Sequence, residues 1–287
     1  MKLTEKLWLA ARIVFCGAML TICEASYAGA IFLTGHDPDF HASLGGNSTG
    51  AININTTAIN YVMDPTFNPF IATAPKFLFV ESTIAVPLGH TNGVNGIVDS
   101  GYTAGVNFDQ ATSSTLNSAL DALGQAGGYS AIVIASDFGG ILTQAELDIL
   151  DIRAPDIINF LNAGGGLYAM AESNGGAGLT PNGGHFGFLP FIVASAQLDQ
   201  SEVGNTVTPF GLSLGLANSD VNGNASHNIF TGTGGLNVVD YDAQGNILSL
   251  ATRSQITVTG VVPEPATISL LGLGLAGLGF SLRKRAS

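Results

Sequence analysis

The chain has 287 residues, of which 46% are hydrophobic and only 10% are charged, and its formal net charge is −12. A mean hydropathy of +0.37 with so few charged side chains argues against an intrinsically disordered chain, which needs low hydrophobicity and high charge. The excess of acidic residues argues against a nucleic-acid partner, because such binding depends on Lys and Arg that neutralise phosphates.

The first 28 residues have the three parts of a secretory signal, which hands a chain to the Sec export machinery. Two lysines make a basic start, an apolar run of 11 residues spans 13–23, and small residues stand at Ser26 and Ala28. We expect cleavage after Ala28, with cleavage after Ala30 as the alternative. The other interpretation is an uncleaved anchor, although a membrane span needs about 20 apolar residues.

Removing the two ends of the chain changes its composition. Both cysteines, Cys16 and Cys23, leave with the signal, so the exported part has no disulfide, no thiol nucleophile and no Cys metal ligand. Residues 29–262 keep 18 of the 21 acidic residues but only three of the nine basic ones, a formal charge of −15. The three basic residues are Lys76, Arg153 and Arg253.

Residues 29–260 are predicted to form one α/β domain. Short apolar runs bounded by Gly or polar residues indicate strands that are buried on both faces of a parallel sheet. They lie at 30–34, 76–80, 131–135 and 167–171. Helical patterns occur at 49–62, 112–123 and 143–162, the last with a capping box of Thr143 and Glu146 and with Pro155 as a kink or break. The alternation predicts a flavodoxin-like three-layer sandwich with a mainly parallel sheet.

Three stretches depart from this alternation. Asn92-Gly93 and Asn95-Gly96 predict hairpin turns within 82–110. Residues 174–210 are rich in Gly, Asn and Phe and predict long loops. Two runs at 236–241 and 246–250, separated by a polar turn, predict a terminal hairpin.

The stretches AIVIASDFGGIL, NAGGGLYAMAES and SHNIFTG resemble the class I glutamine amidotransferase-like superfamily, which includes proteins of the ThuA type. The resemblance implies the same α/β fold, with Gly139-Gly140 at the place of an oxyanion hole. In the catalytic members the later strand leads into Gly-x-Cys-x-Gly, whereas here it ends in Met170-Ala171-Glu172-Ser173. The resemblance therefore supports the fold and puts amidotransferase chemistry in doubt.

Polar residues follow each predicted strand directly, where open parallel α/β sheets usually bind ligands. The candidate binding or catalytic residues are His36, Asp37, Glu81, Asp137, Glu172 and His185. Such a set could hold a divalent metal or supply paired carboxylates for glycoside hydrolysis. The alternative is that the acidic residues cap loops and helices by accepting backbone N–H groups. The sequence identifies no cofactor beyond such a metal.

Two segments imitate calcium-binding loops. The weak candidate ligands are Asp220 and Asn222 in the first and Asp240 and Asp242 in the second. Neither segment has the bidentate Glu that the EF-hand loop needs at its twelfth position, so each also fits an ordinary turn.

Residues 261–287 form a tail in three parts. Pro263-Glu264-Pro265 comes first, a 17-residue apolar segment follows at 266–282, and Arg283-Lys284-Arg285 comes last. As a helix the apolar segment would be about 25 Å long, slightly short for a single transmembrane span of about 30 Å. The basic triplet should stay cytoplasmic by the positive-inside rule.

This tail closely resembles the PEP-CTERM sorting signal of Gram-negative bacteria. The resemblance implies that the tail parks the exported protein in the inner membrane and that an exosortase recognises and cleaves near Pro263-Glu264-Pro265. Such a tail is sometimes called an ice-binding protein C-terminal domain, although nothing in these residues suggests ice binding. The alternative is a plain tail anchor after a chance Pro-Glu-Pro.

We therefore expect an exported protein of the cell surface or extracellular matrix, with an α/β domain that is non-catalytic or associated with carbohydrate such as exopolysaccharide. The acidic, Lys-poor domain is compatible with work among hydrated polymers. The alternative hypothesis is a hydrolase that acts on exopolysaccharide with carboxylates and histidines at the strand ends.

Overall fold

The structure is a computed structural model, and it describes residues 29–81, 94–136, 142–170, 186–189, 193, 195–198 and 201–254. The predictions that lie outside the described residues concern the cleavage site at Ala28 and the tail 261–287, the turn at Asn92-Gly93, the oxyanion-hole position at Gly139-Gly140, and the site candidates Asp137, Glu172 and His185. Among the described residues, no helix has the length and apolar character that a membrane crossing requires.

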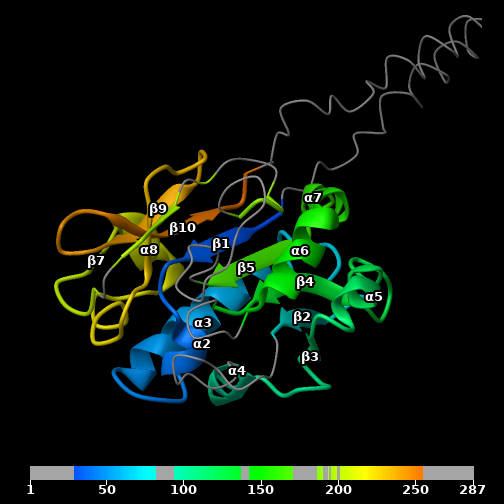
Figure 1. Cartoon of the computed structure of the whole chain (residues 1–287), viewed down its shortest axis with the longest axis horizontal. Coiled ribbons are helices and arrows are strands. Elements are labelled where there is room, and N and C mark those ends of the chain that lie inside the picture. The colour runs from blue at the N-terminus through cyan, green and yellow to red at the C-terminus, as the bar shows by residue number, and fades with distance from the viewer. Residues whose placement is uncertain are drawn as a thin grey trace, which may run out of the picture.

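One mixed sheet of ten strands organises the domain (Figure 1). Its main path runs β3 (Phe108–Ala111), β2 (Lys76–Val80), β4 (Tyr129–Ile134), β5 (Gly166–Met170), β1 (Ile31–Thr34), β10 (Ile247–Thr252), β8 (Asn228–Phe230) and β6 (Ser195–Gln197). Beside this path, β9 (Asn237–Tyr241) pairs with β10, and β7 (Thr206–Val207) pairs with β9.

The predicted α/β class is confirmed, but the sheet is not mainly parallel. The first five strands pair in parallel through four contacts, whereas five antiparallel contacts join the remaining strands to one another and to β1. The parallel strands lie in the order 3-2-4-5-1, which differs from the flavodoxin-like order 2-1-3-4-5. The difference arises because β1 lies next to β5, where it joins the parallel strands to the antiparallel strand β10.

Helices cover both faces of the sheet, as a three-layer sandwich requires. One core cluster joins alternate strand residues to α5 (Leu116–Leu120), α6 (Gln144–Ile152) and α7 (Ala154–Asn162). The other joins the opposite strand residues to α3 (Ser48–Val62), α4 (Val94–Asp99) and α8 (Pro209–Leu214). Figure 1 shows α6 and α7 on one side of the strands, and α3 with the short α2 (Pro38–His41) on the other.

The predicted long helix is two helices. Pro155 lies in the first turn of α7, where its missing N–H needs no partner, so α6 ends and α7 begins just before it. The capping box is confirmed, because the Thr143 N–H donates to Glu146 Oε2 at 2.8 Å. Gly164 ends α7 with φ +100°, a left-handed conformation that favours glycine.

The hairpin turn predicted at Asn95-Gly96 is wrong, because both residues belong to α4. A Cβ on Gly96 would lie 1.8 Å from the Asp39 carbonyl oxygen, so glycine permits α4 to pack directly on α2. The loops predicted over 174–210 contain β6, β7 and the start of α8 among their described residues. The terminal hairpin is confirmed as β9 and β10.

The described chain starts and ends at the same end of the sheet. Ile31 pairs with Thr252 in the antiparallel ladder of β1 and β10. Gly29 and Ala30 are buried, and the Ala30 carbonyl accepts a hydrogen bond from the Leu167 N–H at 2.9 Å. Cleavage after Ala28 would keep both residues and cleavage after Ala30 would remove them, and the choice between the two sites stays a prediction.

Candidate functional site

Segments that are far apart in the sequence meet at the carboxyl end of β1. His36 forms an antiparallel bridge with Ser226, and the His227 N–H donates to the Gly35 carbonyl at 2.8 Å. A Cβ on Gly35 would lie 1.9 Å from the Asn228 carbonyl oxygen, so only glycine allows this approach. The crossing places His36 and Asp37 beside the segment that precedes β8.

His36 is the centre of a buried hydrogen-bonded chain. Its Nδ1 lies 2.6 Å from Ser226 Oγ, and its Nε2 lies 2.7 Å from Asp240 Oδ2. The order Ser, His, Asp is that of a hydrolase triad, but Ser226 has no exposed surface to present to a substrate. We therefore interpret this chain as a polar network that fixes β1 against β9.

A second cluster lies next to the first and was only partly predicted. Asp37 Oδ2 lies 3.2 Å from His227 Nε2, and Asp37 Oδ1 lies 3.3 Å from His41 Nε2. Asp37 has no exposed surface, and the side chains of His41 and His227 are 13% and 6% exposed. Sequence reasoning missed both histidines, although the Asp37-x-x-x-His41 spacing places two ligand types on one helical face.

Asp39 connects the ends of two strands that are not neighbours. Its Oδ2 accepts hydrogen bonds from the Ser136 N–H at 2.9 Å and the Ser136 hydroxyl at 3.1 Å, just beyond the end of β4. The Phe40 N–H donates to its other oxygen at 3.0 Å. Burial, aided by the nearby charge of Asp37, raises the pKa of Asp39 to about 6, although these hydrogen bonds oppose the rise.

Two other residues that the sequence singled out, Glu81 and Asp240, lie in different places. Glu81 is buried at the end of β2, where Gln110 of β3 donates to its Oε2 at 3.2 Å. Asp240 belongs to the His36 network rather than to a loop. The structure thus brings His36 and Asp37 together with His41, His227 and Asp240.

The oxygens of the other calcium candidates accept hydrogen bonds from protein donors. Asp220 accepts from the Ala217 N–H at 2.8 Å and from the Asn53 amide at 3.0 Å, and Asn222 accepts from the Asn205 N–H at 2.9 Å. Asp242 accepts from the N–H groups of residues 244 and 246. The contact from residue 244 makes Asp242 part of an Asx turn, whereas Asp220 and Asn222 accept from more distant residues. Calcium binding stays a prediction.

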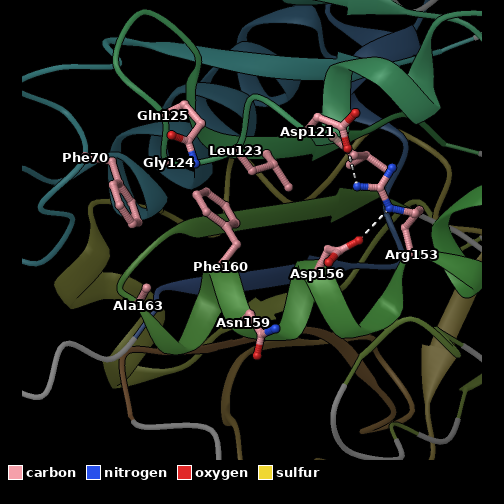
Figure 2. A pocket seen from close by; sticks show the side chains of 11 residues that line it. Phe70, Asp121, Leu123, Gly124, Gln125, Arg153, Asp156, Asn159, Phe160 and Ala163 are labelled. Atoms are coloured by element: carbon pink, nitrogen blue, oxygen red, sulfur yellow. Dashed lines mark hydrogen bonds and ion pairs between the residues drawn. The ribbon is translucent and has the colours of Figure 1, made fainter.

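A cleft of about 400 Å³ opens at the other end of the sheet, between α5, α7 and the loops that precede β2, β4 and β5 (Figure 2). Phe70 and Phe160 stack at its apolar end, with ring centroids 5.5 Å apart. Figure 2 shows Arg153 between Asp121 and Asp156 at its polar end. The exposed amides of Gln125 and Asn159 also line the cleft.

Comparison with known proteins identifies the tail. Residues 261–285 match the family model for the PEP-CTERM protein-sorting motif. The chain carries this sorting motif. The motif implies that the protein is exported, is held transiently in a membrane by its tail, and is a target of an exosortase. Neither the curated proteins nor the solved structures gave a match, so these comparisons do not confirm the amidotransferase-like resemblance of the α/β domain.

Proposed function

We propose that this exosortase target is a protein of the cell surface or extracellular matrix whose α/β domain binds exopolysaccharide without cleaving it. The observation that carries the binding role is the cleft between α5 and α7. It joins an aromatic pair to exposed amide and carboxylate side chains within one concave surface, and its volume lies within the range of small-ligand sites, about 300 to 1,000 Å³.

The lining of the cleft suits a sugar chain. Amides such as Gln125 and Asn159 donate to and accept from sugar hydroxyls. Phe160 is buried against Phe70, so this pair forms the apolar wall of the cleft rather than a free ring face. The cleft has one apolar end and one polar end, and ligand pockets in general combine apolar surface with a few polar groups that fix orientation.

Charge indicates a neutral polymer rather than an anionic one. Each of the three basic side chains in residues 29–262 has an acidic partner: Lys76 pairs with Asp109, Arg253 with Asp64, and Arg153 with both Asp121 and Asp156. An anionic polysaccharide would therefore meet the acidic surface of the domain without a basic side chain to neutralise it.

The cleft is tested by replacing Gln125 and Asn159 together with alanine. Each lost hydrogen bond is worth about 0.5–1.5 kcal/mol, so the pair should weaken binding by about tenfold. The measurement is retardation of the processed protein in gels that contain neutral exopolysaccharide purified from the host. A matched pair of exposed amides on the other side of the domain, Asn237→Ala with Gln244→Ala, should leave retardation unchanged.

Equal retardation of the cleft variant and the wild-type protein would contradict the binding role of the cleft. Loss of retardation in the Asn237 and Gln244 control would instead place binding elsewhere on the domain. Circular dichroism of both variants checks that the fold is kept.

The sorting role makes a separate prediction. Changing Pro263-Glu264-Pro265 to three alanines should abolish processing and leave full-length precursor in the inner membrane. Fractionation of the host and mass spectrometry of the protein measure both effects. A control pair in the same linker, Thr257→Ala with Thr259→Ala, should be processed normally. Release of the triple variant at the wild-type level would refute processing by an exosortase.

A hydrolase remains the second candidate, because carboxylates and histidines do converge at the carboxyl end of β1. Asp39 does not fit the role of a general acid there, since both of its oxygens accept hydrogen bonds from the protein and it has no exposed surface. New reducing ends in exopolysaccharide incubated with the processed protein would favour hydrolysis over binding.

A further inference from the structure

The segments that carry Asp37, His41 and His227 are held by three hydrogen bonds to backbone carbonyls. The short α2 carries Asp37 at its N-cap and His41 in its last turn, and the Asn55 amide anchors it by donating to the Pro38 carbonyl at 3.0 Å. The backbone of His227 is fixed on both sides, since its N–H donates to Gly35 and its carbonyl accepts from the Leu198 N–H at 2.7 Å. The three side chains therefore meet without depending on a mobile loop.

The direction of the Asp37 carboxylate is unusual for its position. An Asp at an N-cap normally accepts a hydrogen bond from the first turn of its helix. Asp37 makes no such bond, and each of its oxygens faces the Nε2 atom of a different histidine. The carboxylate thus brings two imidazole nitrogens to one point instead of capping α2.

The separations fit a metal ion. At a zinc–ligand distance of about 2.0–2.1 Å, tetrahedral geometry places neighbouring ligand atoms about 3.3 Å apart. Asp37 Oδ1 lies 3.3 Å from His41 Nε2, Asp37 Oδ2 lies 3.2 Å from His227 Nε2, and one ligand atom from each of the three residues lies within 4.8 Å of the others. The three side chains are therefore close enough to share one ion after a small adjustment of their ligand atoms.

His41 is poorly explained as part of a simple ion pair. Neither of its ring nitrogens makes a hydrogen bond to any residue that the structure describes, although both atoms are buried. Its Nε2 approaches Asp37 at 3.3 Å without the geometry of a hydrogen bond. Buried polar atoms usually have partners, and an ion at the centre of the cluster would supply one for Nε2.

We propose that Asp37, His41 and His227 bind one divalent transition metal ion, with Zn²⁺ as the best match. Two imidazole nitrogens and one carboxylate oxygen suit zinc, whereas calcium and magnesium prefer sets made of oxygen alone. Three protein ligands leave a fourth tetrahedral position for a water molecule or an external ligand. The site lies at the opposite end of the sheet from the cleft, so it does not depend on the proposed binding of polysaccharide.

The test is calorimetric titration of ZnCl₂ into processed protein that was recovered from the host and stripped with a chelator. We expect one Zn²⁺ per chain in the wild-type protein. Outer-sphere changes typically weaken metal binding 10- to 100-fold, so removing a direct ligand in His41→Ala should weaken binding by about 100-fold or more. A large excess of Ca²⁺ should not displace the zinc.

Two variants keep the test decisive. His41→Gln fills the space of the imidazole and should lose zinc as well, which covers the case in which His41→Ala does not fold. Asp148→Asn removes an exposed carboxylate on α6 and should bind zinc normally. Wild-type zinc affinity in His41→Gln, or displacement of the zinc by Ca²⁺, would overturn the proposal. Retardation by polysaccharide should be the same in all of these variants.

Discussion

Asp240→Ala is expected to lower the free energy of unfolding by about 3–5 kcal/mol, the usual penalty for removing one partner of a buried pair. Asp240 has no exposed surface, and its Oδ2 lies 2.7 Å from His36 Nε2. Without the carboxylate, the buried imidazole and the Ser226 hydroxyl behind it lose the group that orients them. Urea unfolding followed by circular dichroism measures the effect.

A second variant separates the effect of losing the polar partner of His36 from the effect of losing side-chain volume at residue 240. The double variant His36→Phe with Asp240→Leu removes both polar partners and keeps the space filled, so it should be more stable than Asp240→Ala. Asp148→Ala, which removes an exposed carboxylate on α6, should change stability by no more than about 0.5 kcal/mol. A loss of less than 1 kcal/mol in Asp240→Ala would contradict the proposed role of the network.

Asp39→Asn should change how stability depends on pH. Burial raises the pKa of Asp39 from 3.8 to about 6, so the folded state holds its proton more tightly than the unfolded state does. Between these two values the wild-type protein loses stability as the pH rises, because folding must retain a proton that the unfolded chain has released. The loss is complete above the folded pKa and amounts to about 3 kcal/mol.

The asparagine variant carries no such proton. Its stability relative to the wild-type protein should therefore increase between pH 4 and pH 7, whatever fixed effect the substitution has on the hydrogen bond from Phe40. Urea unfolding of both proteins at several pH values, with chelator present, gives the difference directly. A difference that stays constant over this range would show that Asp39 is ionised in the folded state throughout.

Local patterns in the sequence predicted local structure well. The run KFLFV is β2 with the expected bounds, and Thr143, Glu146 and Pro155 define the start of α6 and the break before α7. The order of the strands could not be read in the same way, because β1 lies between β5 and β10 through pairings that join residues more than 130 positions apart. No spacing within the chain records such a contact.

The partners of His36 and Asp37 at the carboxyl end of β1 could not be predicted from the sequence either. His36 and Asp37 were predicted because they follow a strand, which is a local signal. Their partners Ser226 and His227 lie 190 positions away, in a segment that precedes an antiparallel strand the sequence did not predict. Asp240 was predicted as a weak calcium ligand because of its spacing from Asp242. In the structure its partner is His36, which lies 204 positions away in the sequence. Only the folded sheet makes these residues neighbours.

The ladder between β1 and β10 gives the exported domain two distinct poles. Residue 29 and residue 254 leave the sheet at one pole, and only eight residues separate Ser254 from Pro263, a covalent reach of at most about 32 Å. While the tail is in the membrane, this short connection keeps the pole that carries the cleft near the lipid. If the cleft binds long polymers as proposed, we expect their access to it to increase once the tail is cut.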